Sequence, residues 1–364
     1  MEDNLDLLLK RAVELNASDV HLSVGVPCQY RIHGDIIAQN GGQALTAQDT
    51  AKFAAKILLK SRKATPENVR DVITQMSDED LSYSITGLGR FRVNICCQRG
   101  TLSLVLRNIP NRIPGFEELN LPPVLAEIAM EERGLILVTG ITGSGKSTTL
   151  AAMVDYINKL KGGKIITIED PIEFLHENKK ASVVQREVGI DTESFARAMR
   201  ASLRQDPDVI LVGEMRDRET IETALRAGET GHLVLSTLHT TDTAKTIQRI
   251  VSYFDLSEQK LMRLRLSESM KAIISQRLLT RLDIPGRIVA IEIMRNTLAV
   301  RDCIENPEKT DAIYEFMKTG KDPYGMQTFD QHLMELYKAG NISLDEAKRN
   351  ATSPDDFERN LKFI

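Results

Sequence analysis

Residues 140–147 constrain the fold of this chain more than any other segment. They read Gly-Ile-Thr-Gly-Ser-Gly-Lys-Ser and match the phosphate-binding pattern G-x-x-x-x-G-K-[ST] at every required position. The apolar run 135–138 leads into the loop as a buried strand, and 148–160 leaves it with the composition of a helix. In such a strand–loop–helix unit, backbone N–H groups and the helix N-terminus hold a polyphosphate. The segment therefore predicts a nucleoside triphosphate site.

The P-loop pattern also assigns contacts to single residues. Lys146 is expected to reach the β- and γ-phosphates, and the Ser147 hydroxyl to ligate Mg²⁺. Neither Asn158-Lys159-Leu160-Lys161 nor Asn178-Lys179-Lys180-Ala181 ends in the aspartate of a guanine-binding N-K-x-D signature, which favours ATP over GTP. The residues expected to contact the nucleotide are Gly140, Thr142, Gly143, Ser144, Gly145, Lys146, Ser147 and Thr148.

Length and charge limit the other functions open to the chain. Its 364 residues are enough for about two domains, and a net charge of -4 gives no general electrostatic reason to expect nucleic-acid binding. No run approaches the roughly 18 apolar residues of a membrane span. The acidic start Met1-Glu2-Asp3-Asn4 lacks the basic region of a signal peptide. We therefore expect a cytoplasmic protein whose membrane contacts are peripheral.

The four cysteines do not indicate a metal site. Cys28, Cys96, Cys97 and Cys303 form no C-x-x-C pair, so zinc-binding spacing is absent. We expect all four to be buried, reduced thiols, with Cys96 and Cys97 on opposite faces of a strand.

Residues 1–108 are predicted to form a separate α+β domain. Apolar spacing indicates helices at 5–16 and 46–59, the second capped by Thr46, and strands at 19–24, 29–37, 80–85, 90–97 and 102–108. Residues 109–120 are the predicted linker, because the periodicity breaks at 109–115 where two prolines and a glycine occur.

Residues 121–364 are predicted to form the nucleotide-binding domain. Strands expected at 135–139, 164–169, 209–212, 233–237 and 287–293 alternate with helices at 195–204, 218–228 and 243–254, which is typical of a parallel sheet covered by helices. The last 70 residues are expected to be mostly helical, with a capping box at Ser343 and Glu346.

Hydrolysis needs acidic groups at the edge of the sheet where the P-loop lies. The strand 165–168 runs into Glu169, Asp170 and Glu173, and the strand 209–212 runs into Gly213 and Glu214. Glu214 is a candidate for binding Mg²⁺ through water or for a role in hydrolysis. The alternative for each segment is a solvated acidic loop.

Two histidines bracket the strand at 233–237. His232 precedes it and His239 follows it, so a pair that senses the γ-phosphate is one interpretation and structural histidines are the other. Metal binding by the pair is not expected, because a strand of seven residues separates the rings by about 20 Å.

Taken in chain order, these segments resemble the type II/IV secretion ATPase superfamily. Thr-Ile-Glu-Asp-Pro-Ile-Glu-Phe at 167–174 resembles its Asp box, Val-Gly-Glu-Met-Arg-Asp at 212–217 its Walker B segment, and 227–240 its His box. Within the superfamily, Ser-Asp-Val-His-Leu at 18–22, the segment 268–278 and Gly-Met-Gln-Thr-Phe-Asp at 325–330 are similar to those of PilT/PilU-type motors of type IV pili.

The resemblance implies a hexameric ring ATPase with a PAS-like first domain and a RecA-like second domain. It implies that Glu173 activates water, that Glu214 is the Walker B glutamate and that His232 and His239 form the His-box pair. It also places Arg92 and Arg107 of the first domain at the γ-phosphate, which makes the linker a hinge. From the residues alone, both arginines would be interpreted as solvated charges on strands.

The implied activity is ATP-driven retraction of a type IV pilus through an inner-membrane platform protein. One departure keeps an accessory PilU-like motor open: Glu305 stands where retraction motors carry the second arginine of a motif aligned with 299–306. A pilus-assembly or type II secretion ATPase is a second alternative. A DNA-translocating ATPase is a third, although Arg197, Arg200 and Arg204 are better interpreted as a solvated face or a subunit contact.

Overall fold

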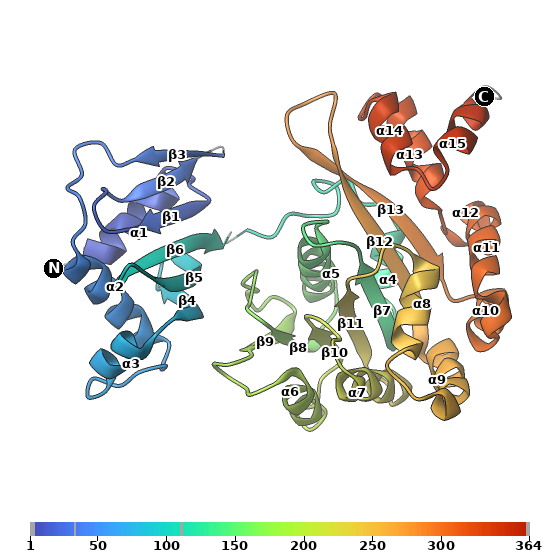
Figure 1. The fold of residues 1–364 in the computed structure, drawn as a ribbon. Helices are drawn as coiled ribbons and strands as arrows, with labels where there is room; N and C mark the ends of the chain where they lie inside the picture. The colour runs from blue at the N-terminus through green and yellow to red at the C-terminus, as the bar shows by residue number, and fades with distance from the viewer. Residues whose placement is uncertain (1–3, 33, 110–111, 362–364) are drawn as a thin grey trace. The chain divides into compact units, whose positions relative to one another are not determined.

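The computed structural model describes residues 4–32, 34–109 and 112–361, and it divides into two compact units. The N-terminal unit holds residues 1–112 with 173–175, and the C-terminal unit holds 113–172 with 176–364. Pro110 and Asn111, in the predicted linker, lie outside the described residues, as does His33. Figure 1 labels the elements of both units.

The N-terminal unit is a six-stranded antiparallel sheet with helices packed on one face. The strand order is β3-β2-β1-β6-β5-β4. Apolar residues at alternate positions of the strands meet the helices in one core, which includes Leu9, Phe53, Phe91 and Leu104. Its elements are α1 (Asn4–Glu14), β1 (Asp19–Leu22), β2 (Gln29–Ile32), β3 (Asp35–Ala38), α2 (Ala47–Lys60), α3 (Val69–Gln75), β4 (Asp78–Ile85), β5 (Gly89–Gln98) and β6 (Thr101–Ile109).

The C-terminal unit is built on a seven-stranded sheet in the order β13-β12-β7-β11-β10-β8-β9. All neighbours are parallel except β12 and β13, which form an antiparallel hairpin. The strands are β7 (Gly134–Thr139), β8 (Gly163–Glu169), β9 (Ala181–Glu187), β10 (Val209–Val212), β11 (Leu233–Leu238), β12 (Met270–Thr280) and β13 (Arg287–Arg295).

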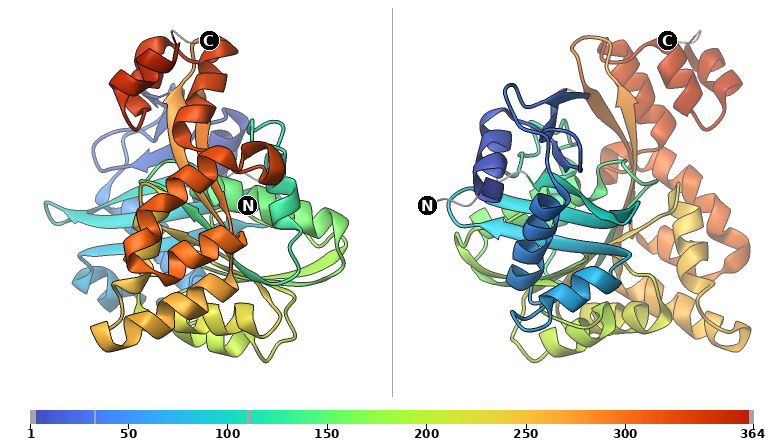
Figure 2. Two further views of the ribbon diagram at one scale, coloured as in Figure 1. Left: turned by 90° about the vertical axis from the view of Figure 1, so that its right-hand side faces the viewer. Right: turned by 60° about the vertical axis from the view of Figure 1, so that its left-hand side comes forward.

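Helices cover both faces of this sheet (Figures 1 and 2). One core joins α4 and α5 to the sheet, and a second joins the helices α6 to α11 to the other face. The three last helices pack on the β12–β13 hairpin through a separate cluster around Phe329. The helices are α4 (Val124–Ala129), α5 (Lys146–Leu160), α6 (Phe195–Ser202), α7 (Arg218–Glu229), α8 (Thr243–Val251), α9 (Leu256–Ser269), α10 (Leu298–Glu305), the 3₁₀ helix η1 (Pro307–Ala312), α11 (Ile313–Thr319), α12 (Lys321–Tyr324), α13 (Phe329–Lys338), α14 (Leu344–Asn350) and α15 (Pro354–Leu361).

The predicted fold class is confirmed: an α+β unit precedes a RecA-like P-loop unit whose C-terminal region is helical. The strands β9 and β12 and the helix α9 were not among the expected elements. Sequence reasoning missed the boundary between α9 and β12 because no glycine or proline separates the two elements.

Two local expectations were wrong. Ser343 accepts a bond from the Glu346 N–H at 3.1 Å, but the Glu346 carboxylate accepts from the Thr280 N–H at 3.2 Å, so the reciprocal half of a capping box is missing. Among the cysteines, Cys28 and Cys303 are buried, whereas Cys96 is partly exposed and Cys97 is exposed near the end of β5. All four are free thiols, as expected.

Candidate nucleotide site

The carboxyl ends of four parallel strands place the predicted site residues along one edge of the sheet. The P-loop follows β7, His239 follows β11, Glu214 follows β10 and Glu169 ends β8. Because β11 lies between β7 and β10, His239 stands between the P-loop and Glu214. This is the edge at which open parallel sheets bind their ligands.

The P-loop has the backbone that a phosphate cradle requires. Gly145 caps α5 in the left-handed conformation, with φ of 91°, which side chains rarely adopt. Gly140 leaves no room for a side chain, since a Cβ there would lie 2.5 Å from Ser144 Oγ and 2.6 Å from the Gln276 carbonyl. The buried Ser144 hydroxyl has no hydrogen-bond partner in the structure. A closed loop with an unpaired hydroxyl and a helix N-terminus fits a bound phosphate group.

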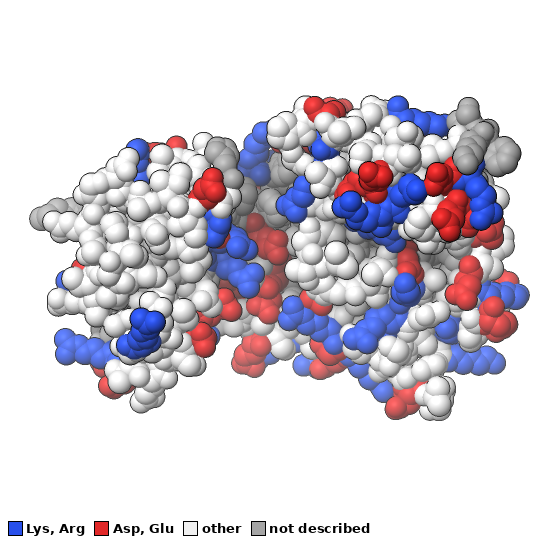
Figure 3. Space-filling model, turned by 45° about the horizontal axis from the view of Figure 1, so that its top comes forward, with Lys and Arg blue, Asp and Glu red and all other residues white. Residues whose placement is uncertain are grey.

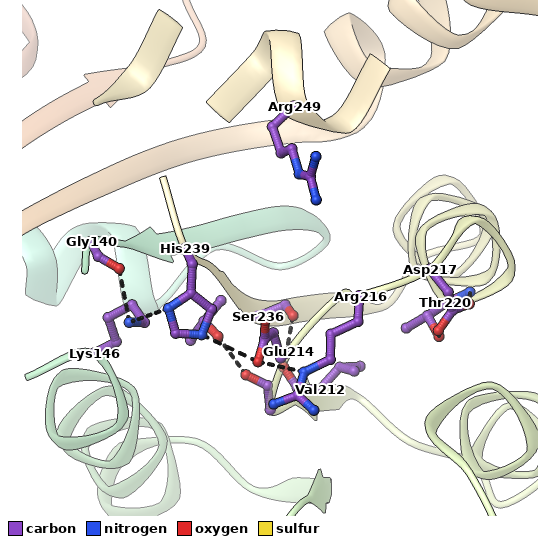
Figure 4. Close-up of polar contacts among 12 residues, drawn as sticks. Gly140, Lys146, Val212, Glu214, Arg216, Asp217, Thr220, Ser236, His239 and Arg249 are labelled. Carbon is purple, nitrogen blue, oxygen red and sulfur yellow. Dashed lines mark hydrogen bonds and ion pairs between the residues drawn. The ribbon is translucent and has the colours of Figure 1, made fainter. Parts of the chain in front are cut away.

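Lys146, His239 and Glu214 form a connected row (Figure 4). Lys146 Nζ donates to the carbonyls of Gly140 and Ile141, at 2.9 and 3.1 Å, and lies 3.4 Å from His239 Nδ1. His239 Nε2 lies 3.3 Å from Glu214 Oε2. An ammonium can only donate and a carboxylate can only accept, so the row suits a neutral imidazole that carries its proton on Nε2.

The loop around Glu214 is fixed on both sides. The Gly213 N–H donates to the Ile168 carbonyl at 2.8 Å, and Thr237 Oγ1 donates to the Gly213 carbonyl at 2.6 Å. Arg216 Nε donates to Glu214 Oε2 at 2.8 Å. The side chain of Glu214 is 16% exposed, so it is accessible from the edge of the sheet.

Sequence reasoning missed two buried polar contacts behind the P-loop. Gln276 of β12 donates from Nε2 to Thr149 Oγ1 of α5 at 2.7 Å, and Thr139 donates to Ser275 Oγ at 2.9 Å. Both contacts join β12 to the strand and helix that flank the loop. The available signal was the polar segment Ser275-Gln276-Arg277, which separates the apolar residues 272–274 from 278–279.

The structure does not bring His232 to this edge. It precedes β11, and its Nδ1 lies 3.0 Å from the Ala227 carbonyl, while its own carbonyl accepts from the Gly134 N–H at the start of β7. The two histidines bracket β11 as predicted, but the two ends of one strand lie at opposite edges of the sheet. This position agrees with the structural interpretation of His232, and its place in the His-box pair stays a prediction.

Two carboxylates of the predicted Asp box have contrasting positions. Glu169 Oε1 accepts from Thr167 Oγ1 at 2.6 Å and from Gln185 Nε2 of β9 at 3.2 Å. Glu173 is exposed and belongs to the segment 173–175 of the N-terminal unit. Its assignment to water activation stays a prediction.

Arg92 and Arg107 lie opposite each other on β5 and β6, on the sheet face away from the helices. Arg107 is also opposite Asp19 of β1, and its Nε donates to Asp19 Oδ1 at 2.9 Å. Burial opposes ionisation of Asp19, but hydrogen bonds from Arg107 and Ser18 outweigh it and lower the pKa of the carboxyl. The acidic residue of the Ser-Asp-Val-His-Leu segment thus holds Arg107, which sequence reasoning did not foresee.

Charge on the surface is mixed. On the face shown in Figure 3, Lys and Arg are interspersed with Asp and Glu. Arg197 pairs with Glu193 and Arg200 pairs with Glu219.

In the described part of the chain, no helix is long and apolar enough to cross a membrane.

The family described as "Type II/IV secretion system protein" matches residues 1–353. The "Type IV pilus retractation ATPase PilT" of Pseudomonas aeruginosa is 45% identical over 350 residues, which cover 96% of this chain and 98% of that protein. The "Twitching motility protein" of Neisseria gonorrhoeae is 42% identical, covering 95% of this chain and 90% of its own length. A crystal structure of the pilus retraction motor PilT with bound ADP superposes with a TM-score of 0.88 at 45% identity, over 99% of this chain and all of that one.

Proposed function

This chain belongs to the type II/IV secretion system protein family, and we propose that it is an ATP-hydrolysing motor that drives retraction of a type IV pilus. The observation that supports this most strongly is the row from Lys146 through His239 to Glu214, at the edge of the sheet where the P-loop lies. The row connects the lysine of the P-loop to an acidic group that follows β10, two strands away, which a site for binding alone does not need.

ATP binding would change the partners of Lys146. In the structure its ammonium donates to two P-loop carbonyls. Phosphate oxygens offer stronger, charge-assisted acceptors, so Lys146 turns toward them while the loop N–H groups and Ser144 Oγ hold the remaining oxygens. That movement separates Lys146 from His239 Nδ1. His239 Nδ1 would then lose its contact with Lys146, while Nε2 would keep its contact with Glu214.

Ser147 and Glu214 are the residues that would hold Mg²⁺, with Glu214 acting through water. A hydroxyl and a carboxylate that supplement phosphate oxygens and waters are the donor set that Mg²⁺ uses in nucleotide sites. When bound, Mg²⁺ neutralises charge on the β- and γ-phosphates. Glu173 is proposed to orient the attacking water, and Thr148 to contact the nucleotide from the first turn of α5.

Arg92 and Arg107 complete the proposal. We place them at the γ-phosphate of a neighbouring subunit in a hexameric ring, where their charge would stabilise the transition state. Arginines in this role contribute roughly 10³–10⁵ in rate. Asp19 would fix the orientation of Arg107, and the linker 109–120 would act as the hinge between the two units. Hydrolysis would thereby change the angle between the units and move a platform protein at the inner membrane.

Deletion of the gene in its host tests the direction of the motor. Cells that lose a retraction motor accumulate pili and stop twitching, and a plasmid copy restores retraction whereas Lys146→Ala does not. Cells without pili would contradict retraction and support an assembly motor. Normal retraction after deletion would leave only an accessory role of the PilU-like kind.

A further inference from the structure

A polar cavity lies at the opposite edge of the sheet from the P-loop. Its volume is about 280 Å³, and its walls include Arg133, Gly134, Gly228, Ser269, Lys271 and Arg301. These residues come from the start of β7, the end of α7, the junction of α9 with β12, and α10. The six residues of β7 separate the cavity from Gly140 by about 20 Å, so it is distinct from the nucleotide site.

Two glycines allow the backbones around the cavity to pack closely. A Cβ on Gly134 would lie 2.6 Å from the Ser269 carbonyl and 2.7 Å from Lys271 Cγ. A Cβ on Gly228 would lie 3.2 Å from Gly134 Cα. Any side chain at Gly134 would therefore displace Ser269 and Lys271.

Two hydrogen-bond donors in the walls have no acceptor. Ser269 is only 3% exposed, and its Oγ has no hydrogen-bond partner in the structure. Arg301 Nε is also buried, and it has no partner among the residues that the structure describes. A buried donor left unpaired costs roughly 1–3 kcal/mol, so unpaired groups of this kind need an explanation. Two of them lining one cavity point to an acceptor that occupies it.

The charges around the cavity favour an anion. Arg133, Lys271 and Arg301 contribute three cationic groups, and Glu229 and Glu268 also line the cavity. Glu229 already accepts hydrogen bonds from Nε and Nη2 of Arg265, at 2.7 and 3.0 Å. Glu268 and Arg133 are both exposed, so they offset each other at the rim, and Lys271 has a distant partner, Glu131, at 3.5 Å. The cations therefore exceed the acids that remain to balance them.

We propose that this cavity is a binding site for a carboxylate group. A guanidinium edge and a hydroxyl are donors that suit the two oxygens of a carboxylate, with Lys271 and Arg133 supplying further charge. The volume is below the usual range for drug-sized ligands, so it suits one small polycarboxylate or one acidic side chain of a partner protein. A free polycarboxylate and an acidic side chain of a protein would be recognised by the same chemistry.

The site can be tested on the full chain with ADP and Mg²⁺ present, so that the P-loop is occupied. The first probe is tricarballylate, titrated into the protein and followed by calorimetry. A titration with sodium chloride at the same ionic strength is the blank. The second is a short acetylated Glu-Asp peptide. Ser269→Ala and Arg301→Lys are compared with wild type, and Arg226→Gln, which changes an exposed arginine of α7 that does not line the cavity, is the matched control.

We expect wild type and Arg226→Gln to bind at least one probe equally, and both cavity variants to bind it roughly ten- to a hundredfold more weakly, as for a lost charge-assisted bond. Tighter binding of tricarballylate would identify a free ligand, and tighter binding of the peptide a protein partner. Without a probe, Ser269→Ala should unfold at the same or a higher temperature than wild type, because its hydroxyl has no partner to lose. The proposal would be overturned if neither probe bound, or if all four proteins bound a probe equally. It would also be overturned if Ser269→Ala lowered the unfolding temperature in the absence of a probe.

Discussion

Replacement of Glu214 by glutamine separates a catalytic from a structural role for the row at the sheet edge. The substitution keeps the size of the side chain and removes its charge. Glu214 Oε2 receives both Arg216 Nε at 2.8 Å and His239 Nε2 at 3.3 Å. The Arg216 side chain is 60% exposed, so its ion pair contributes no more than about 1 kcal/mol to folding.

The expected effect on turnover is much larger than that on folding. An acid–base or metal-positioning group contributes roughly 10²–10⁴ in rate. At about 1.36 kcal/mol for each factor of ten, this is about 3–5 kcal/mol of transition-state stabilisation. We therefore expect Glu214→Gln to bind ATP and to fold with a stability within about 1 kcal/mol of wild type, while kcat falls at least about a hundredfold.

The assay is steady-state phosphate release, with ATP affinity and the urea midpoint measured on the same samples. Glu219→Gln is the matched control, because Glu219 is an exposed acid on the following helix that pairs with Arg200. The control should retain wild-type turnover. A kcat of Glu214→Gln within threefold of wild type, or a loss explained wholly by unfolding, would refute the role assigned to Glu214.

Three further outcomes are expected. Glu173→Gln should keep ATP affinity and lose turnover; normal phosphate release would remove Glu173 from the mechanism. Thr149→Val leaves the buried Gln276 amide donor without its acceptor and should lower the free energy of unfolding by about 1–3 kcal/mol, read from the urea midpoint; an unchanged midpoint would contradict it. Burial lowers the pKa of His176 to about 4, against the opposing effect of Asp155, so stability is full above about pH 6.5 and falls by about 3 kcal/mol toward pH 4. His176→Phe should flatten this part of the pH profile, and a profile identical to wild type would exclude His176 as its source.

The sequence was sufficient to predict the parts of the site that follow apolar strands. The runs at β7, β8, β10 and β11 each end in a glycine, an acid or a histidine, and parallel pairing brings those ends to one edge. His232 shows what this reasoning excludes, because a residue that precedes β11 lies at the amino edge of the parallel strands, opposite the P-loop. Its ring contacts Ala227 rather than the P-loop.

Other contacts depend on pairings that have no local signal. Gln276 reaches Thr149 only because β12 lies beside β7, across 127 residues of chain. Asp19 reaches Arg107 because β1 lies beside β6, 88 residues apart. Single-sequence patterns predict elements through periodicity, whereas these bonds follow from the order of strands in each sheet.

The most direct test of the central proposal is a mixing experiment with Lys146→Ala and Arg92→Ala. Each variant alone should hydrolyse ATP at a small fraction of the wild-type rate. If the arginine acts on the site of a neighbouring subunit, rings assembled from both variants contain sites with an intact Lys146 from one subunit and an intact Arg92 from the next. We predict that co-assembled mixtures recover a substantial part of wild-type turnover. Mixtures that stay as inactive as the separate variants, in rings shown by mass measurement to contain both, would contradict a site shared between subunits.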